Sequence, residues 1–244
     1  MAAIRLFDIT SKLPSKAWSP NVWKTRYILN YKNLPYETTW VEYPDIASTC
    51  LKIGASPTTR AGKYTLPVIQ DTNTGAVISD SWNIVEYLES TYPPANPEHS
   101  LIPPGTRGLQ LAFLSAFRTQ LRALWPIAIP QEVAILTPRS EEYFRKTREE
   151  FLKPENLKEE MVRGHWNQLE RDLGVVDSWI RKEDIFVMGG GRATYPDFVV
   201  AALMIWCRTL WGRESGEWGE RIAKWHGGRW GRLVEKLQEY EKIV

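Results

Sequence analysis

The chain has 244 residues, of which 43% are hydrophobic and 25% are charged, and its formal net charge is +2. This length suits two domains with sizeable cores, and so balanced a charge does not favour a nucleic-acid partner. The longest apolar run, residues 198–207, is about half of a bilayer span, and there is no secretory signal pattern. We therefore expect no membrane partner.

Cys50 and Cys207 are far apart and form no C-x-x-C pair, which favours a reducing, cytoplasmic location. Three histidines without ligand-like spacing argue against a metal site.

The chain begins with a strand signal followed by a helix signal. Residues 4–9 form a short apolar run, and residues 20–31 are amphipathic. Proline fits the first helical position, and the preceding serine is a favoured N-cap. A hydroxyl at the positive end of a helix dipole can also stabilise an anion. Ser19 therefore either caps the helix only or also has a chemical role.

The following segments complete a pattern of alternating strands and helices. We predict strands at 36–41, 66–69 and 76–78, a short helix at 44–54 that ends at glycine, and a helix at 81–92. The order β-α-β-α-β-β-α indicates a mixed sheet with helices packed against it.

A proline-rich stretch after this pattern predicts a connector, with helices beyond it. We place one domain at residues 1–94, a linker at 95–104 and an all-helical domain at 105–244. The first helical signal is an apolar stripe that Pro126 interrupts, with Leu109, Phe113, Phe117, Leu121 and Leu124. A long helix follows from about Pro154, and a capping box at Thr194–Asp197 precedes the run 198–207, which we expect to be buried. The last signal is an amphipathic C-terminal helix with Leu233, Leu237 and Ile243.

Two short motifs in the first domain have both a structural and a functional interpretation. Pro67 begins a strand, either as an edge-strand proline or as a cis-proline that turns the backbone of Val68 toward a ligand. Residues 79–81 lie where a strand ends and a helix begins: either Ser79 and Asp80 act only as caps, or Asp80 and Ser81 hold the charged end of an amino acid. Capping alone explains such residues about half the time.

Taken together, these pieces resemble the cytosolic glutathione transferases across essentially the whole chain. The resemblance lies in the order of Ser19–Arg26, Leu66–Ile69, Asp80–Ser81 and Tyr195–Phe198. Phe7–Ile9 and Trp18–Asn21 are most similar to the fungal-specific class A (Fua) enzymes, relatives of bacterial β-etherases. The resemblance implies an α+β thioredoxin-like N-terminal domain, with a mixed four-stranded sheet and helices, and an all-α C-terminal domain.

The resemblance also implies a role for each matching residue. Ser19 would donate a hydrogen bond to the glutathione sulfur, and Pro67 would be the family's cis-proline. The Val68 backbone would pair with the cysteinyl part of glutathione, and Asp80 and Ser81 would hold its γ-glutamyl end. Asp197 matches a structural capping residue. Serine, where related classes have cysteine, favours thiolate stabilisation over covalent redox chemistry.

Alternatives remain for the thiol-activating residue. The Asn21 amide, in the first turn of the same helix, can also donate a hydrogen bond and is the main competitor of Ser19. Ser11 and Ser15, in the preceding polar loop, are weaker candidates.

The glycyl carboxylate of glutathione needs a cation, and Lys52, Arg60 and Lys63 are the candidates. Charged loop residues are more often simply solvated. The loop 56–63 is either a flap over the active site or a tolerated insertion.

The second substrate would lie against the helical domain, where residues 121–125 and 206–211 supply aromatic and apolar side chains. Planar aromatic molecules such as polyphenols are the expected guests. We predict a detoxifying glutathione transferase, with peroxidase or aryl-ether-cleaving side activity, that needs glutathione as co-substrate and no metal. The alternative is a ligandin-like carrier with little turnover, and the resemblance implies a homodimer in either case.

A third hypothesis, single-stranded nucleic acid binding, rests on residues 224–232, where basic and aromatic residues alternate. It is one short segment in a nearly neutral chain, and we rank it last.

Overall fold

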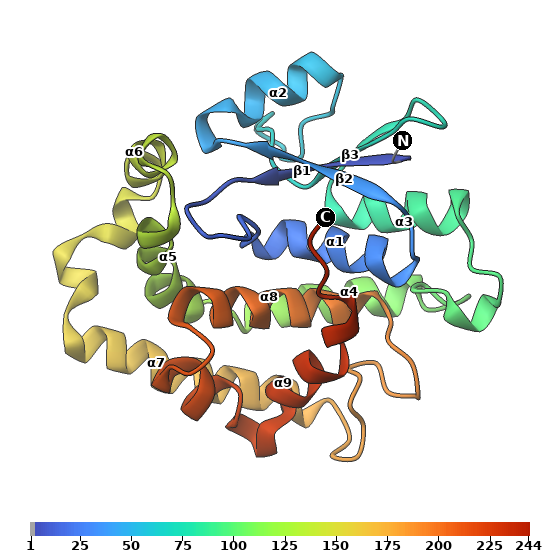
Figure 1. The fold of residues 1–244 in the computed structure, drawn as a ribbon. Helices are drawn as coiled ribbons and strands as arrows, with labels where there is room; N and C mark the ends of the chain where they lie inside the picture. Colours follow the sequence, from blue (N-terminus) through green and yellow to red (C-terminus); the bar gives the residue numbers. More distant parts are fainter. Residues whose placement is uncertain (1–2) are drawn as a thin grey trace.

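The first part of the molecule is a four-stranded sheet with helices on both faces. A computed structural model describes residues 3–244 (Figure 1). The strands are β1 (Ile4–Ile9), β2 (Tyr36–Val41), β3 (Val68–Asp71) and β4 (Val77–Ser79), in the spatial order β2-β1-β3-β4. β1 pairs in parallel with β2 and antiparallel with β3, and β3 pairs antiparallel with β4. Helices α1 (Pro20–Tyr31) and α3 (Ser81–Thr91) cover one face of the sheet, and α2 (Ile46–Ile53) covers the other. The predicted thioredoxin-like arrangement is confirmed.

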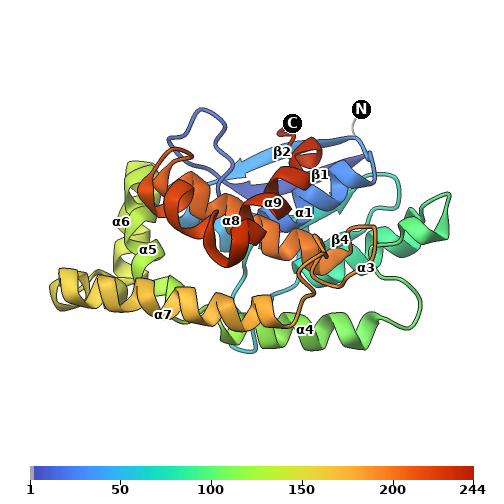
Figure 2. The same ribbon diagram turned by 90° about the horizontal axis from the view of Figure 1, so that it is seen from below.

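The second part of the molecule consists of helices joined by loops, with no strand among its described residues. Its helices are α4 (Arg107–Thr119), α5 (Leu124–Ile135), α6 (Pro138–Thr147), α7 (Glu159–Ser178), α8 (Tyr195–Trp211) and α9 (Trp225–Lys236), with short 3-10 and π turns between some of them. Helix α8 lies between α1 and α7 in both views (Figures 1 and 2). The predicted all-α second part is confirmed.

Helix α8 forms the centre of the molecule, and the start that the sequence predicts for it is present. The Asp197 carboxylate accepts the N–H and hydroxyl of Thr194 at 2.7 and 2.9 Å and the N–H of Val187 at 2.6 Å. Every residue of 198–207 except Val199 is buried, so the all-apolar run is explained by contacts on all sides. The cap role of Asp197 is confirmed.

A buried ion pair joins α1 to the sheet. Arg26 donates to the Asp8 carboxylate at 2.8 Å and to the hydroxyls of Tyr36 and Thr38 at 3.2 Å. Burial raises the pKa of Asp8 to about 6, although Arg26 opposes the rise. Because Arg26 lies on α1 and Asp8 on β1, this network holds the middle of α1 against the sheet.

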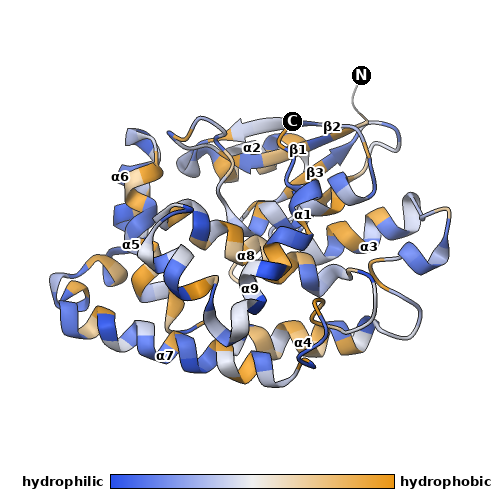
Figure 3. Cartoon of the chain, turned by 60° about the horizontal axis from the view of Figure 1, so that its bottom comes forward, coloured by the Kyte–Doolittle hydropathy of each residue, from blue (hydrophilic) through white to orange (hydrophobic). Residues whose placement is uncertain are grey.

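Hydrophilic and hydrophobic residues alternate along α4 and α7 (Figure 3). In α7, the side chains of Trp166, Leu169, Leu173 and Val176 are buried, as the sequence predicts. The predicted apolar stripe does not begin at Leu109, because the Leu109 side chain is 64% exposed and does not face the core.

Three predicted boundaries in the helical part differ from the structure. Pro126 does not interrupt a helix but lies in the first turn of α5, where its missing N–H is no loss. Helix α7 begins at Glu159, because a separate 3-10 turn occupies Pro154–Leu157.

The third difference is that Ile243 lies outside helix α9, which ends at Lys236. The last residues instead run along the sheet domain, where Asn30 donates to the Tyr240 carbonyl at 2.6 Å and Thr38 donates to the Val244 carbonyl at 2.5 Å. These hydrogen bonds to a different part of the chain replace those of a longer helix.

Candidate active site

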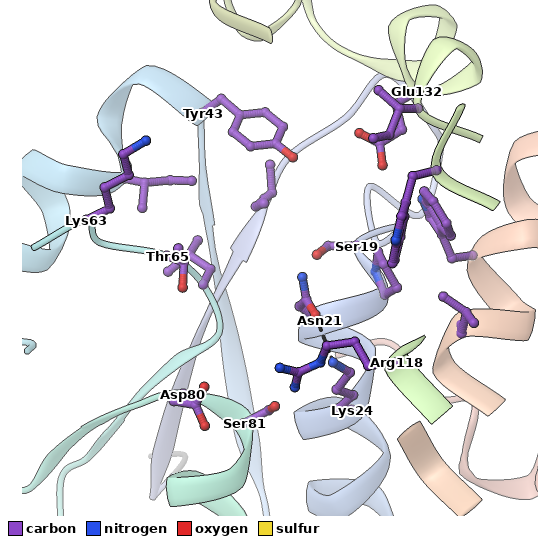
Figure 4. Close-up of a pocket in the computed structure, with 18 of the residues that line it drawn as sticks. Ser19, Asn21, Lys24, Tyr43, Lys63, Thr65, Asp80, Ser81, Arg118 and Glu132 are labelled. Atoms are coloured by element: carbon purple, nitrogen blue, oxygen red, sulfur yellow. Dashed lines mark hydrogen bonds between the residues drawn. The ribbon is translucent and has the colours of Figure 1, made fainter. Parts of the chain in front are cut away.

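A cavity of about 1140 Å³ lies between the sheet domain and the helical domain. Its walls come from the N-terminal ends of α1 and α3, the segment before β3, and helices α4, α5, α6 and α8 (Figure 4). The predicted residues Ser19, Asn21, Asp80 and Ser81 all line it, so the fold brings them together from separate elements.

Ser19 is the N-cap residue of α1, but its hydroxyl makes no capping hydrogen bond. The residue is only 3% exposed, and its side chain lies in the cavity wall. Pro20 follows at the first helical position, as predicted. The Ser19 hydroxyl is therefore available to a ligand at the positive end of a helix dipole.

Asn21 and Ser11, two of the other candidates near Ser19, have protein partners. Asn21 accepts a hydrogen bond from Lys24 Nζ at 2.8 Å through its carbonyl oxygen. Ser11 donates to the Lys16 carbonyl at 3.0 Å and is not among the residues that line the cavity, nor is Ser15.

Asp80 has an unusual backbone conformation at the start of α3. Its φ is 76°, in the left-handed region that non-glycine residues seldom adopt. Its carboxylate accepts the N–H of Trp82 at 2.8 Å, so the predicted cap is present. Asp80 is exposed to the cavity and Ser81 is half-buried beside it.

The peptide bond between Leu66 and Pro67 is cis, as the resemblance predicts. Thr65 and Leu66 line the cavity, whereas Pro67 and Val68 are not among its lining residues. Val68 is buried in β3, between β1 and β4. The cavity therefore meets this segment just before the cis bond.

Of the three cations considered for the glycyl carboxylate, Lys63 lines the cavity, and Lys52 and Arg60 do not. The loop 56–63 closes on itself, since the Thr58 N–H donates to the Lys63 carbonyl at 2.9 Å. Whether this loop acts as a flap stays a prediction.

Two further cations in the cavity were missed from the sequence. Lys24 of α1 and Arg118 of α4 lie together below Ser19 (Figure 4). Burial and the charge of Arg118 lower the pKa of Lys24 to about 8, and Asp80 opposes this. Lys24 is three residues after Asn21, a spacing that places both on one helix face. No spacing in the sequence relates Arg118 to these residues, because Arg118 belongs to the helical domain.

The helical side of the cavity is aromatic. The rings of Trp125 and Trp206 are 5.7 Å apart, and Leu121 lies beside them in the cavity wall. These three come from the two segments predicted for the second substrate, whereas residues 207–211 do not line the cavity. Tyr43, from the sheet domain, directs its hydroxyl into the same space (Figure 4).

One carboxyl group, that of Glu132 on α5, lies in this aromatic wall. The residue is 6% exposed. Burial raises its pKa to about 8, opposed by Arg148 and by the indole N–H of Trp206. No local pattern in the sequence selects this residue.

Comparison with known proteins places this architecture in a family. Residues 18–91 match the model of the glutathione S-transferase N-terminal domain, and residues 108–240 match that of the C-terminal domain. The chain belongs to the glutathione S-transferase family.

Two fungal family members of known structure are similar along the whole chain. A glutathione S-transferase of Ceriporiopsis subvermispora in complex with glutathione is 40% identical, with a TM-score of 0.91 over 99% of both chains. GSTFuA3 of Phanerochaete chrysosporium is 42% identical, with a TM-score of 0.89 over 99% of this chain and 98% of that one. The predicted likeness to the fungal class A transferases is confirmed.

A curated relative, the glutathione S-transferase-like protein ustS of Aspergillus flavus, is 32% identical over 91% of this chain and 88% of its own length. Among residues 3–244, no helix is long and apolar enough to cross a bilayer. The same residues contain no cluster of three or more histidine, cysteine or acidic side chains suited to a metal.

The segment 224–232 of this transferase has structural roles. Arg229 is buried, pairs with Asp177 and donates to the Arg181 carbonyl at 3.0 Å. Trp230 is also buried and donates to His226 Nδ1 at 2.9 Å. Arg229 and Trp230 therefore help to hold the helical domain together.

Proposed function

We propose that this protein is a glutathione transferase in which the Ser19 hydroxyl donates a hydrogen bond to the glutathione sulfur. The observation that carries the proposal is a hydroxyl at a helix N-terminus that faces a cavity and makes no capping bond. A free thiol has a pKa of about 8.5, so only a few per cent is thiolate at neutral pH. A hydroxyl donor and a helix N-terminus lower that pKa, and each unit corresponds to about 1.4 kcal/mol in favour of the thiolate.

The charges around Ser19 suit the rest of a glutathione molecule, which has two carboxylates and one ammonium group. Lys24, Lys63 and Arg118 supply cations in the cavity wall, and Asp80 supplies a carboxylate. We propose that Asp80 and Ser81 hold the γ-glutamyl end and that Lys63 holds the glycyl carboxylate. The glutathione complex of the Ceriporiopsis relative supports a glutathione site in this family member.

The cysteinyl part of glutathione would pair with the extended backbone near the cis-proline. The family resemblance assigns this contact to Val68, and that assignment stays a prediction. The nearby Leu66 is the better candidate, because Leu66 lines the cavity, whereas Val68 is enclosed within the sheet.

Replacing Ser19 with alanine tests the proposal. We expect kcat/KM for 1-chloro-2,4-dinitrobenzene to fall on the order of tenfold to a hundredfold, with the midpoint of the pH–rate profile moving up toward the free thiol. The matched control is Ser15→Ala, since Ser15 is exposed and outside the cavity. A larger loss in Asn21→Ala than in Ser19→Ala would assign the thiol to Asn21 instead.

The size of the aromatic cavity favours a second candidate, a carrier of polyphenolic ligands. The same variants separate the two functions. Negligible turnover by the parent protein, together with aromatic-dye binding that Ser19→Ala leaves intact, would favour the carrier. Three further points stay predictions: activity toward cumene hydroperoxide and an aryl ether, the cytoplasmic location, and the homodimer. Light scattering of the purified protein tests the homodimer.

A further inference from the structure

The Glu132 carboxyl is the one acidic group on the aromatic side of the cavity among the described lining residues. It lies on α5 and points into the cavity on the same side as the hydroxyls of Ser19 and Tyr43 (Figure 4). The indole N–H of Trp206 lies against it but makes no hydrogen bond of standard geometry to any described residue. A buried acid without a hydrogen bond or ion pair of standard geometry to the described residues is a candidate for contact with the second substrate.

The surroundings of Glu132 favour its neutral form. From the sheet domain it faces Tyr43, on which Tyr143 of α6 stacks, and from the end of α6 it faces Arg148. Helix α7 buries only apolar side chains, and α8 contributes the neutral Trp206. Arg148 is therefore the cation that opposes protonation. A glutathione thiolate in the same cavity would disfavour a second anion there.

We propose that protonated Glu132 donates a hydrogen bond, and then its proton, to the carbonyl oxygen of a conjugated aromatic ketone or aldehyde bound at the aromatic side. This inference rests on the proposed function and identifies Glu132 as the residue that selects for such substrates. A hydrogen-bond donor fixed in an apolar wall stabilises the negative charge that develops on the carbonyl oxygen of the substrate while the glutathione sulfur attacks.

The reaction is an addition in which all atoms are retained. The glutathione sulfur forms a bond to the β-carbon of the substrate, and the electron pair of the C=C bond moves toward the carbonyl oxygen. That oxygen takes the proton of Glu132, and the enol then tautomerises to the ketone. Glu132 recovers a proton from solvent, which had received the thiol proton.

The test compares two substrates that share a phenyl ring, benzylideneacetone and benzyl bromide. Bromide leaves without needing a proton, so the ratio of the two kcat/KM values isolates the contribution of the acid and cancels thiol ionisation. We expect Glu132→Leu to lower this ratio about tenfold or more. Glu132→Gln keeps a neutral hydrogen-bond donor of the same shape but has no acidic proton, so its ratio should lie between those of the parent protein and Glu132→Leu.

The pH dependence gives a second measurement. In the parent protein the ratio should fall as pH rises through about 8, where Glu132 loses its proton, and in Glu132→Gln it should be flat. Tyr43→Phe is the matched control for the other hydroxyl that faces this space.

Three results would overturn the inference: an unchanged ratio in Glu132→Leu, a decline above pH 8 that persists in Glu132→Gln, or a loss in Tyr43→Phe alone. The benzyl bromide rate reports separately on the proposed function. A parent protein that turns over neither substrate contradicts both proposals, whereas a normal benzyl bromide rate with an unchanged ratio contradicts only the role of Glu132.

Discussion

The two ends of the cavity use different chemistry and depend on different parts of the fold. At the sheet end, charged and hydroxyl side chains such as Lys24 and Ser81 lie in the first turns of helices and line the cavity. At the helical end, the walls are aromatic, with Trp125 and Trp206 in contact and one buried carboxyl, Glu132. Directional polar groups recognise one defined molecule, whereas apolar surface accepts any guest of suitable shape. The first end is thus suited to an invariant co-substrate and the second to variable partners.

The largest effect should come from breaking the helix start on which both ends depend. Helix α8 contributes Tyr195 to the cavity at one end and Trp206 at the other. Asp197→Ala would leave three buried or half-buried donors without a partner, so we expect the free energy of unfolding to fall by about 3 kcal/mol. Urea denaturation measures this, and Asp197→Asn, which keeps one acceptor oxygen, should lose less. A loss below about 1 kcal/mol would contradict the role of this cap.

The next prediction separates the two ends by charge. Lys24→Met removes a cation from the sheet end, and we expect the KM for glutathione to rise about tenfold because a charge-assisted contact is lost. The KM for the aromatic substrate should change little. Lys52→Met is the matched control, since Lys52 is exposed and outside the cavity. Equal changes in both KM values would mean that the two ends are not independent.

A complementary variant acts on the aromatic end. Trp206→Leu removes part of the apolar wall, and we expect the KM for benzyl bromide to rise about fivefold, or about 1 kcal/mol. Glutathione affinity, measured by calorimetry, should be retained. Trp179→Leu controls for loss of an indole, because Trp179 is 42% exposed and does not line the cavity. If Trp206→Leu weakens glutathione binding by the same factor, the division into two ends is wrong.

The smallest effect is a pH dependence of the sheet end. Burial and Arg118 lower the pKa of Lys24 to about 8, so its positive charge is present below that pH and is lost above it. The affinity for S-methylglutathione, which has no ionisable thiol, should therefore fall by a few-fold between pH 7 and pH 9. The difference between the parent protein and Lys24→Met isolates this residue from the titration of the ligand. Parallel pH profiles in the two proteins would contradict the assignment.

The sequence predicted more of the residues at the sheet end of the cavity than at the helical end. The reason is that local signals mark helix starts but not the contacts between helices. Residues such as Ser19 and Asp80 precede helices, and local rules about capping mark such positions. Helices α5 and α6 were not predicted, because two prolines and a nearly uniform apolar composition hide the periodicity of α5. Glu132 belongs to α5, so nothing in the sequence placed it near Ser19.

The chain by itself determined the alternation of strands and helices in its first part, the start of α8 and the position of Ser19 at a helix N-terminus. Each of these depends on residues a few positions apart, and short-range sterics and hydrogen bonds decide them. The tertiary structure alone decided that the Ser19 hydroxyl faces a cavity instead of capping α1, that Arg118 joins Lys24, and that Lys63 lines the cavity while Lys52 does not. These outcomes depend on how the two domains pack, and packing joins residues whose separation in the sequence carries no local signal.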